Sequence, residues 1–197
     1  TVGAAAELAV LLIRKAVKGA EPWPVKPDRT LGDGRRVVFS TKGDRLVTVG
    51  DAGIESWEAE TGKHLGQLWK RDRNTFEPVL YDGFDLAMHP AGKVFAVTST
   101  KRSGRVTIRD ADADRQVASL KDDGLPTEQN QRGSAFTVAF HPDGRLVAVG
   151  GTYKVVALCD VMSGDITATL EGHKRYVSAA VFSPDGTVLG TGDTEGK

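Results

Sequence analysis

A tight turn closed by glycine recurs four times along the chain and limits what it can fold into. The four turns end at Gly43, Gly92, Gly144 and Gly186, and each follows a short apolar run. The turn that ends at Gly144 reads His-Pro-Asp-Gly. Proline presets the backbone angle φ at its second position, and glycine tolerates the left-handed conformation at its fourth. The spacings of 49, 52 and 42 residues between successive glycines indicate one repeated unit. The shortest of these spacings matches the repeat length of about 40–45 residues that is known for one class of repeated four-stranded sheets.

Residues 134–173 show one repeat most clearly. Apolar runs rich in β-formers occupy residues 135–140, 146–149, 155–158 and 166–170, with turn residues between them. Four short strands at this spacing predict an antiparallel meander. Because one such sheet cannot bury both of its faces alone, it needs copies of itself as neighbours. We therefore predict an all-β chain with modules at about residues 35–70, 83–121, 134–171 and 176–197, the last one truncated.

Short motifs within these modules resemble those of a known family. Gly172-His173 stands where the WD-repeat β-propeller family has Gly-His before a first strand. The pairs Trp57-Glu58, Arg109-Asp110 and Cys159-Asp160 stand where that family has Trp-Asp at the end of a third strand. The match covers roughly residues 35–197. It implies an incomplete β-propeller of about three and a half four-stranded antiparallel blades.

The resemblance also implies structural roles for single residues. Asp51, six residues before Trp57, matches the family's buried Asp, which bonds a His and a Ser or Thr. Glu195 fills the same position in the last module, whereas Ser103 and Tyr153 stand there in the second and third. The residues expected to be structural are therefore Asp51, Trp57, Asp110, Asp160, His173 and Glu195.

The first 34 residues have a different composition. Residues 4–18 are mostly helix formers and are followed by Gly19, so we predict a helix that packs on another domain or on the propeller. A helix lying on a membrane surface is the less favoured alternative. Three prolines within residues 21–27 predict an extended linker. Residues 1–34 would then precede a propeller domain at residues 35–197.

The composition excludes several classes of function. Lys plus Arg and Asp plus Glu balance at 26 each, so no overall field favours nucleic acid or an anionic membrane. The single Cys159 allows no intrachain disulfide and fits a reducing, cytoplasmic location. The sequence contains no nucleophile elbow, phosphate-binding loop or zinc-protease motif. We therefore expect no catalytic residue, cofactor or metal, and neither nucleic acid nor a membrane as partner.

Two hypotheses about function remain. In the first, the chain is a non-catalytic scaffold that binds a protein or peptide. In the second, it is a sensor or substrate gate attached to a multidomain enzyme, a kinase or peptidase, whose catalytic domain lies outside this chain. Phe-Ser-Pro-Asp-Gly at residues 182–186 also occurs in propellers that precede peptidase domains, which keeps the second open. Under both, we expect the chain to be a fragment whose remaining blades come from sequence outside it.

Overall fold

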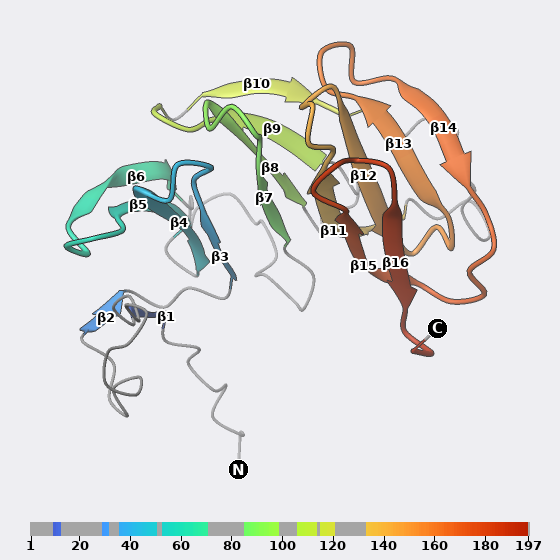
Figure 1. The fold of residues 1–197 in the computed structure, drawn as a ribbon, viewed down its shortest axis with the longest axis horizontal. Helices are drawn as coiled ribbons and strands as arrows, with labels where there is room; N and C mark the ends of the chain where they lie inside the picture. The colour runs from blue at the N-terminus through green and yellow to red at the C-terminus, as the bar shows by residue number, and fades with distance from the viewer. Residues whose placement is uncertain are drawn as a thin grey trace. The chain divides into compact units, whose positions relative to one another are not determined.

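The computed structural model describes residues 10–12, 29–31, 36–50, 53–70, 85–98, 106–113, 115–120 and 133–196. The chain divides into two units, residues 1–71 and residues 72–197, which we treat separately. Every regular element in the described ranges is a β-strand (Figure 1). The predicted all-β fold class is thus confirmed. Among these residues there is no helix long and apolar enough to cross a membrane.

The first unit contains one four-stranded antiparallel sheet. Its strands follow one another in chain order: β3 (Arg36–Phe39), β4 (Arg45–Gly50), β5 (Gly53–Glu58) and β6 (His64–Lys70). Because side chains alternate across a strand, Val47, Val49 and Ile54 share one face and are at most 3% exposed. Val37 and Phe39 lie on the opposite face, where both are exposed.

The predicted helix over residues 4–18 is wrong where the structure describes it. Residues Val10–Leu12 form strand β1, which pairs antiparallel with β2 (Arg29–Leu31). A run of three apolar residues satisfies a strand as well as a helix, so periodicity cannot separate the two. The rest of the predicted helix, and the linker at residues 21–27, lie outside the described residues.

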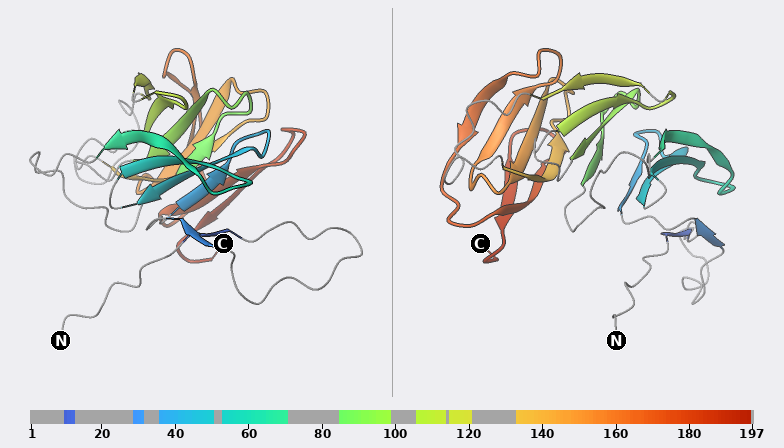
Figure 2. Two further views of the ribbon diagram at one scale, coloured as in Figure 1. Left: turned by 90° about the vertical axis from the view of Figure 1, so that its left-hand side faces the viewer. Right: turned by 180° about the vertical axis from the view of Figure 1, so that it is seen from behind.

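The second unit contains three sheets in sequence order, shown from three directions in Figures 1 and 2. The first consists of β7 (Leu86–Met88), β8 (Val94–Thr98), β9 (Val106–Asp110) and β10 (Gln116–Ser119). The second consists of β11 (Ala135–Phe140), β12 (Leu146–Gly151), β13 (Val156–Asp160) and β14 (Ile166–Leu170). The third has two strands, β15 (Val177–Phe182) and β16 (Leu189–Asp193). All pairings are antiparallel, as a meander requires.

The core of this unit lies between successive sheets. One face of the β11–β14 sheet, which we call its leading face, packs on Ala96 and Ile108 of the preceding sheet; it carries Val138, Phe140, Val147 and Cys159. The opposite, trailing face packs on the following sheet and carries Ala148, Val156 and Leu158. The β11–β14 sheet is therefore buried by a neighbouring sheet on either side, which is the packing of consecutive blades in an incomplete β-propeller.

Candidate functional site

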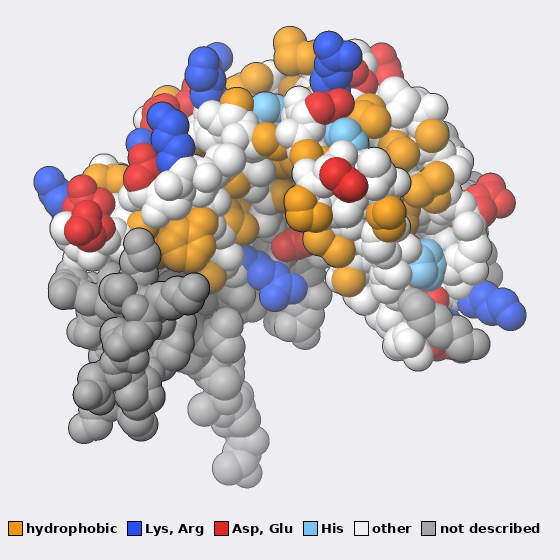
Figure 3. Space-filling view, in the orientation of Figure 1, with side chains coloured by type: hydrophobic (Ala, Val, Ile, Leu, Met, Phe, Trp, Pro, Cys, Tyr) orange, Lys and Arg blue, Asp and Glu red, His pale blue; other side chains and the backbone are white. Residues whose placement is uncertain are grey.

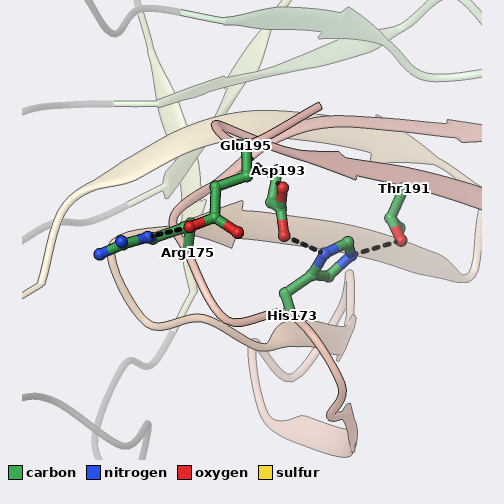
Figure 4. Close-up of polar contacts among 5 residues, drawn as sticks. All are labelled: His173, Arg175, Thr191, Asp193 and Glu195. Atoms are coloured by element: carbon green, nitrogen blue, oxygen red, sulfur yellow. Dashed lines mark hydrogen bonds and ion pairs between the residues drawn. The ribbon is translucent and has the colours of Figure 1, made fainter. Parts of the chain in front are cut away.

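A hydrogen-bonded group around His173 joins the connection between β14 and β15 to strand β16 (Figure 4). His173 lies in the connection from β14 to β15. Its Nδ1 lies 3.1 Å from the Asp193 Oδ2, and its Nε2 lies 2.8 Å from the Thr191 Oγ. Thr191 and Asp193 are two residues apart on β16, so they point to the same side of the strand. With Nδ1–H donated to the carboxylate, the ring accepts the threonine hydroxyl at Nε2.

The carboxylate in this group is that of Asp193, not that of the expected Glu195. The side chain of Asp193 is 3% exposed, and its Oδ1 accepts the backbone N–H of Glu195 at 3.0 Å. Glu195 instead accepts a 2.5 Å bond from the Nε of Arg175 on the exposed side of the same turn. The reason is geometric: Asp193 still lies on the strand and shares a face with Thr191, whereas Glu195 follows the end of the strand.

A hollow of about 280 Å³ opens beside this group. Val156 and Leu170 contribute apolar surface to it, and the His173 group forms one wall. The charged side chains of Glu171, Lys174 and Glu195 complete the lining. The combination of an apolar surface with a few polar groups is typical of sites that bind a ligand side chain.

The residues at the Trp-Asp positions each make hydrogen bonds within their own sheet or turn. The Nε1–H of Trp57 donates to the Thr48 Oγ at 2.9 Å, and its ring stands 4.7 Å from that of His64. Asp51, which was expected to be the buried Asp of this module, lies outside the described residues.

Asp110 and Asp160 close the turns that follow their strands. Asp110 accepts the backbone N–H of Asp112 and a bond from Arg115, and these two bonds lower the pKa of its carboxyl. Asp160 accepts the backbone N–H groups of Ser163 and Met162, with the same effect on its pKa. Next to it, burial raises the pKa of the Cys159 thiol to about 11. These groups are therefore held in their turn or core positions and are not poised for reaction.

The four turn glycines adopt left-handed backbone angles, with φ of +73°, +70°, +76° and +73° in chain order. At Gly144, a Cβ would lie 2.3 Å from the Nε2 of His89, so no larger residue fits without moving that ring. This histidine belongs to the turn after β7, in the preceding sheet.

Two histidines connect the turn of one sheet to the turn of the next. The Nε2 of His89 lies 3.0 Å from the Gly144 carbonyl, and the Nε2 of His141 lies 3.1 Å from that of Gly186. The Nδ1 of His89 accepts the backbone N–H of Ala91 within its own turn, so its Nε2 carries the proton that it donates. The Nδ1 of His141 lies 2.8 Å from the Asp143 Oδ1 in its own turn. Each ring also meets a phenylalanine of the next sheet edge-on, with ring centres 5.1 Å apart for His89–Phe140 and 5.0 Å for His141–Phe182. We call this arrangement the histidine latch.

A second unanticipated link involves Asp85, just before β7. Its Oδ2 accepts the Thr137 hydroxyl at 2.8 Å and the Val138 N–H at 3.1 Å, both on β11. The sequence offered a signal for the latches, since His precedes Pro in two successive turns and Phe precedes the turn in the next module. It offered no comparable repeat for Asp85.

Comparisons with known proteins agree with this architecture. The family described as "WD domain, G-beta repeat" matches residues 164–197. Pre-mRNA-processing factor 19 homolog 2 of Arabidopsis thaliana is 30% identical over 56% of this chain and 20% of its own length. Guanine nucleotide-binding protein subunit beta-5b of Danio rerio is 34% identical over 53% of this chain and 24% of its own length. WD repeat-containing protein SL1-17 of Schistosoma mansoni is 26% identical over 71% of this chain and 40% of its own length.

The chain thus spans between a fifth and two fifths of these relatives. Their names, the repeat match and the stacked antiparallel meanders lead to the same assignment. Residues 164–197 match a WD repeat, and the chain is similar to WD-repeat proteins.

Proposed function

We propose that the chain is part of a non-catalytic scaffold that binds a protein or peptide through the connection from β14 to β15. The observation that carries this proposal is the hollow beside His173, which combines the apolar surfaces of Val156 and Leu170 with charged groups. A peptide side chain could bury its apolar part there while Glu171 and Lys174 contact its polar neighbours.

The group around His173 gives this hollow a fixed wall. Asp193 and Thr191 hold the imidazole from both ring nitrogens, so the loop cannot reorient that ring without breaking two hydrogen bonds. A wall that is already ordered loses less conformational entropy when a ligand binds. The relatives support the same role: one is, by its name, a subunit of a guanine nucleotide-binding protein.

The test is affinity capture with the whole chain and a matched pair of variants. Glu171→Ala with Lys174→Ala removes two of the three charged side chains that line the hollow, and it leaves the group around His173 intact. We expect this variant to lose the proteins that the wild-type chain captures. Met162→Ser, a change at an 89% exposed residue in another turn, should retain them. Equal capture by all three proteins would refute the hollow as the binding site.

The group around His173 also has the order carboxylate, imidazole, hydroxyl, which is that of serine-type hydrolases. We propose that it is structural here, as the family resemblance implies. A fluorophosphonate that labels activated hydroxyls should leave Thr191 unmodified, and stoichiometric labelling that requires His173 would contradict this assignment.

The alternative function, a sensor or gate joined to a catalytic domain outside this chain, is supported by the large share of each relative that the chain leaves unmatched. Under both functions we propose that residues 35–197 form the propeller part, that further blades complete it, and that it acts in the cytoplasm. The interspersed acidic and basic side chains on the face in Figure 3 agree with a protein partner in preference to nucleic acid.

A further inference from the structure

We propose that the two histidine latches of the second unit respond differently to acid. The latch of His89, which joins the β7–β10 and β11–β14 sheets, loosens below neutral pH, whereas the latch of His141, which joins the β11–β14 and β15–β16 sheets, keeps its bonds. The residue that sets the difference is the third of each turn, Ala91 in the first latch and Asp143 in the second. This device is independent of the hollow beside His173.

Both latches make the same bond between sheets. The Nε2 of His89 lies 3.0 Å from the Gly144 carbonyl oxygen, and the Nε2 of His141 lies 3.1 Å from that of Gly186. A carbonyl oxygen only accepts, so Nε2 carries a proton in each ring, whether the ring is neutral or charged. A second proton can therefore be added only at Nδ1, and the surroundings of Nδ1 decide how each latch responds to acid.

In the latch of His89, Nδ1 acts as an acceptor. The backbone N–H of Ala91 points at it, with 3.0 Å between the two nitrogens. A proton on Nδ1 would set two donors against each other, so this bond would be lost and the ring would move away from its turn. The side chain of Ala91 is a methyl group, which offers no oxygen to receive that proton.

In the latch of His141, Nδ1 has a partner in either protonation state. When the ring is neutral, Nδ1 accepts the backbone N–H of Asp143 at 3.2 Å; when it is protonated, it donates to the Oδ1 of Asp143, 2.8 Å away. That oxygen also accepts the backbone N–H of Arg145 at 2.8 Å. The bond from Arg145, followed by that from His141, lowers the pKa of the Asp143 carboxyl, so the carboxylate stays charged over the range in which histidine titrates.

The charged residues of the facing turns act in the same direction. Each ring lies against a glycine in the turn of the next sheet, so the charges of both turns surround it. They are Lys93, Asp143 and Arg145 for His89, and Asp143, Arg145 and Asp185 for His141. A second proton at His89 thus joins two cations and one carboxylate, whereas a second proton at His141 joins one cation and two carboxylates.

The latch of His89 stands over the core that joins the first two sheets of this unit. This core includes Cys159, which is 2% exposed. Only the neutral ring makes the bond to Ala91, so its contribution is present at about pH 7.5 and is lost towards about pH 5.5, where histidine side chains are ordinarily protonated. Loss of one neutral hydrogen bond should raise the open fraction of this junction about two- to tenfold.

The test measures this opening at Cys159 in the full chain at both pH values. The reagent is 2,2′-dithiodipyridine, and the native rate is divided by the rate of the urea-unfolded chain at the same pH, which cancels the ionisation of the thiol itself. Ala91→Asp gives His89 the carboxylate that His141 has and should remove most of the increase. Ala91→Asn, the uncharged control at the same exposed position, should keep it. An equal increase in these two variants, or none in wild type, would overturn the proposal.

The second arm follows the ring N–H signals in chain labelled with ¹⁵N-histidine. In wild type, the Nε2–H of His141 should stay protected from exchange at about pH 5.5, whereas that of His89 should lose protection. Asp143→Asn keeps the size of the side chain and an oxygen for the Arg145 N–H, and it should make His141 as acid-sensitive as His89. Circular dichroism checks that each variant folds. Two rings that lose protection together in wild type would refute the difference between the latches.

Discussion

Replacing Gly144 by alanine should destabilise the second unit through two separable effects. The first is backbone strain, because φ at this residue is +76° and a side chain in the left-handed region costs about 1–2 kcal/mol. The second is loss of the histidine latch, because the new Cβ would lie 2.3 Å from the Nε2 of His89. Displacing the ring removes the 3.0 Å bond to the Gly144 carbonyl and the edge contact with Phe140.

The size of the second effect follows from typical values for its parts. A hydrogen bond contributes a net 0.5–1.5 kcal/mol, roughly, and an aromatic edge contact a similar amount. We therefore expect Gly144→Ala to lower the free energy of unfolding by about 2–5 kcal/mol, of which about 1–3 kcal/mol belongs to the latch. Gly43→Ala measures strain alone, since its φ is +73° and its Cβ meets no atom within 4 Å. That variant should cost only about 1–2 kcal/mol.

Each unit offers its own probe for this comparison. Cys159 is 2% exposed within the core of the second unit, so the urea dependence of its alkylation reports on the opening of that unit. All three tryptophans lie in residues 1–71, so their fluorescence reports on the first. A double-mutant cycle then isolates the latch: in a His89→Ala background, Gly144→Ala should cost only the strain. If the losses in unfolding free energy from His89→Ala and Gly144→Ala simply add in the double variant, the two residues do not stabilise the fold through one contact.

Three further predictions concern single side chains. Because burial raises the pKa of Cys159 to about 11, iodoacetamide should modify the native chain slowly at mildly alkaline pH and the urea-unfolded chain quickly; equal rates would contradict its burial. The Ser183 hydroxyl, followed by the Thr187 N–H, lowers the pKa of Asp185 from 3.8 to about 2, so this carboxylate stabilises the folded chain fully above about pH 4 and loses that effect as the pH falls towards 2. In Asp185→Asn, the melting temperature should therefore fall less between pH 4 and pH 2 than it does in the wild type. The same pH dependence in both proteins would contradict a stabilising role for this carboxylate. Thr48→Val removes the acceptor of the Trp57 indole and should cost about 1 kcal/mol with a shift in tryptophan emission, whereas an unshifted spectrum would show that the bond is absent in solution.

The sheets of the second unit could be predicted because their signals are local. The apolar, β-forming run at residues 135–140 and the turn glycine after it identify a strand and its hairpin without knowledge of any distant contact. The same local signals failed at Val10–Leu12, where three apolar residues pair with Arg29–Leu31. Strand pairing there depends on a partner 19 residues away, which no short window contains.

The group around His173 was predicted only in part, for a related reason. The resemblance to Gly-His pointed to His173, but it placed Glu195 in the carboxylate position of this module. The module that contains β15 and β16 has no Trp within the chain from which to fix the count. Strand geometry decides the matter: Thr191 and Asp193 share a face of β16, and Glu195 lies beyond its end. Side-chain alternation was thus the better guide than motif spacing.

The histidines illustrate why residue type alone misleads in a repeated fold. Histidine is the side chain most often associated with catalysis or metal binding, yet all four in this chain contact neighbouring groups of the fold. His89 and His141 connect successive sheets, His173 bonds to the end of β16, and His64 contacts the Trp57 ring. An imidazole that donates and accepts within the fold keeps its orientation by those bonds, and a ligand would have to displace them. Recognition by this chain is therefore to be sought among exposed charges such as Lys174 and Glu171, whose loop position is fixed by the histidine beside them.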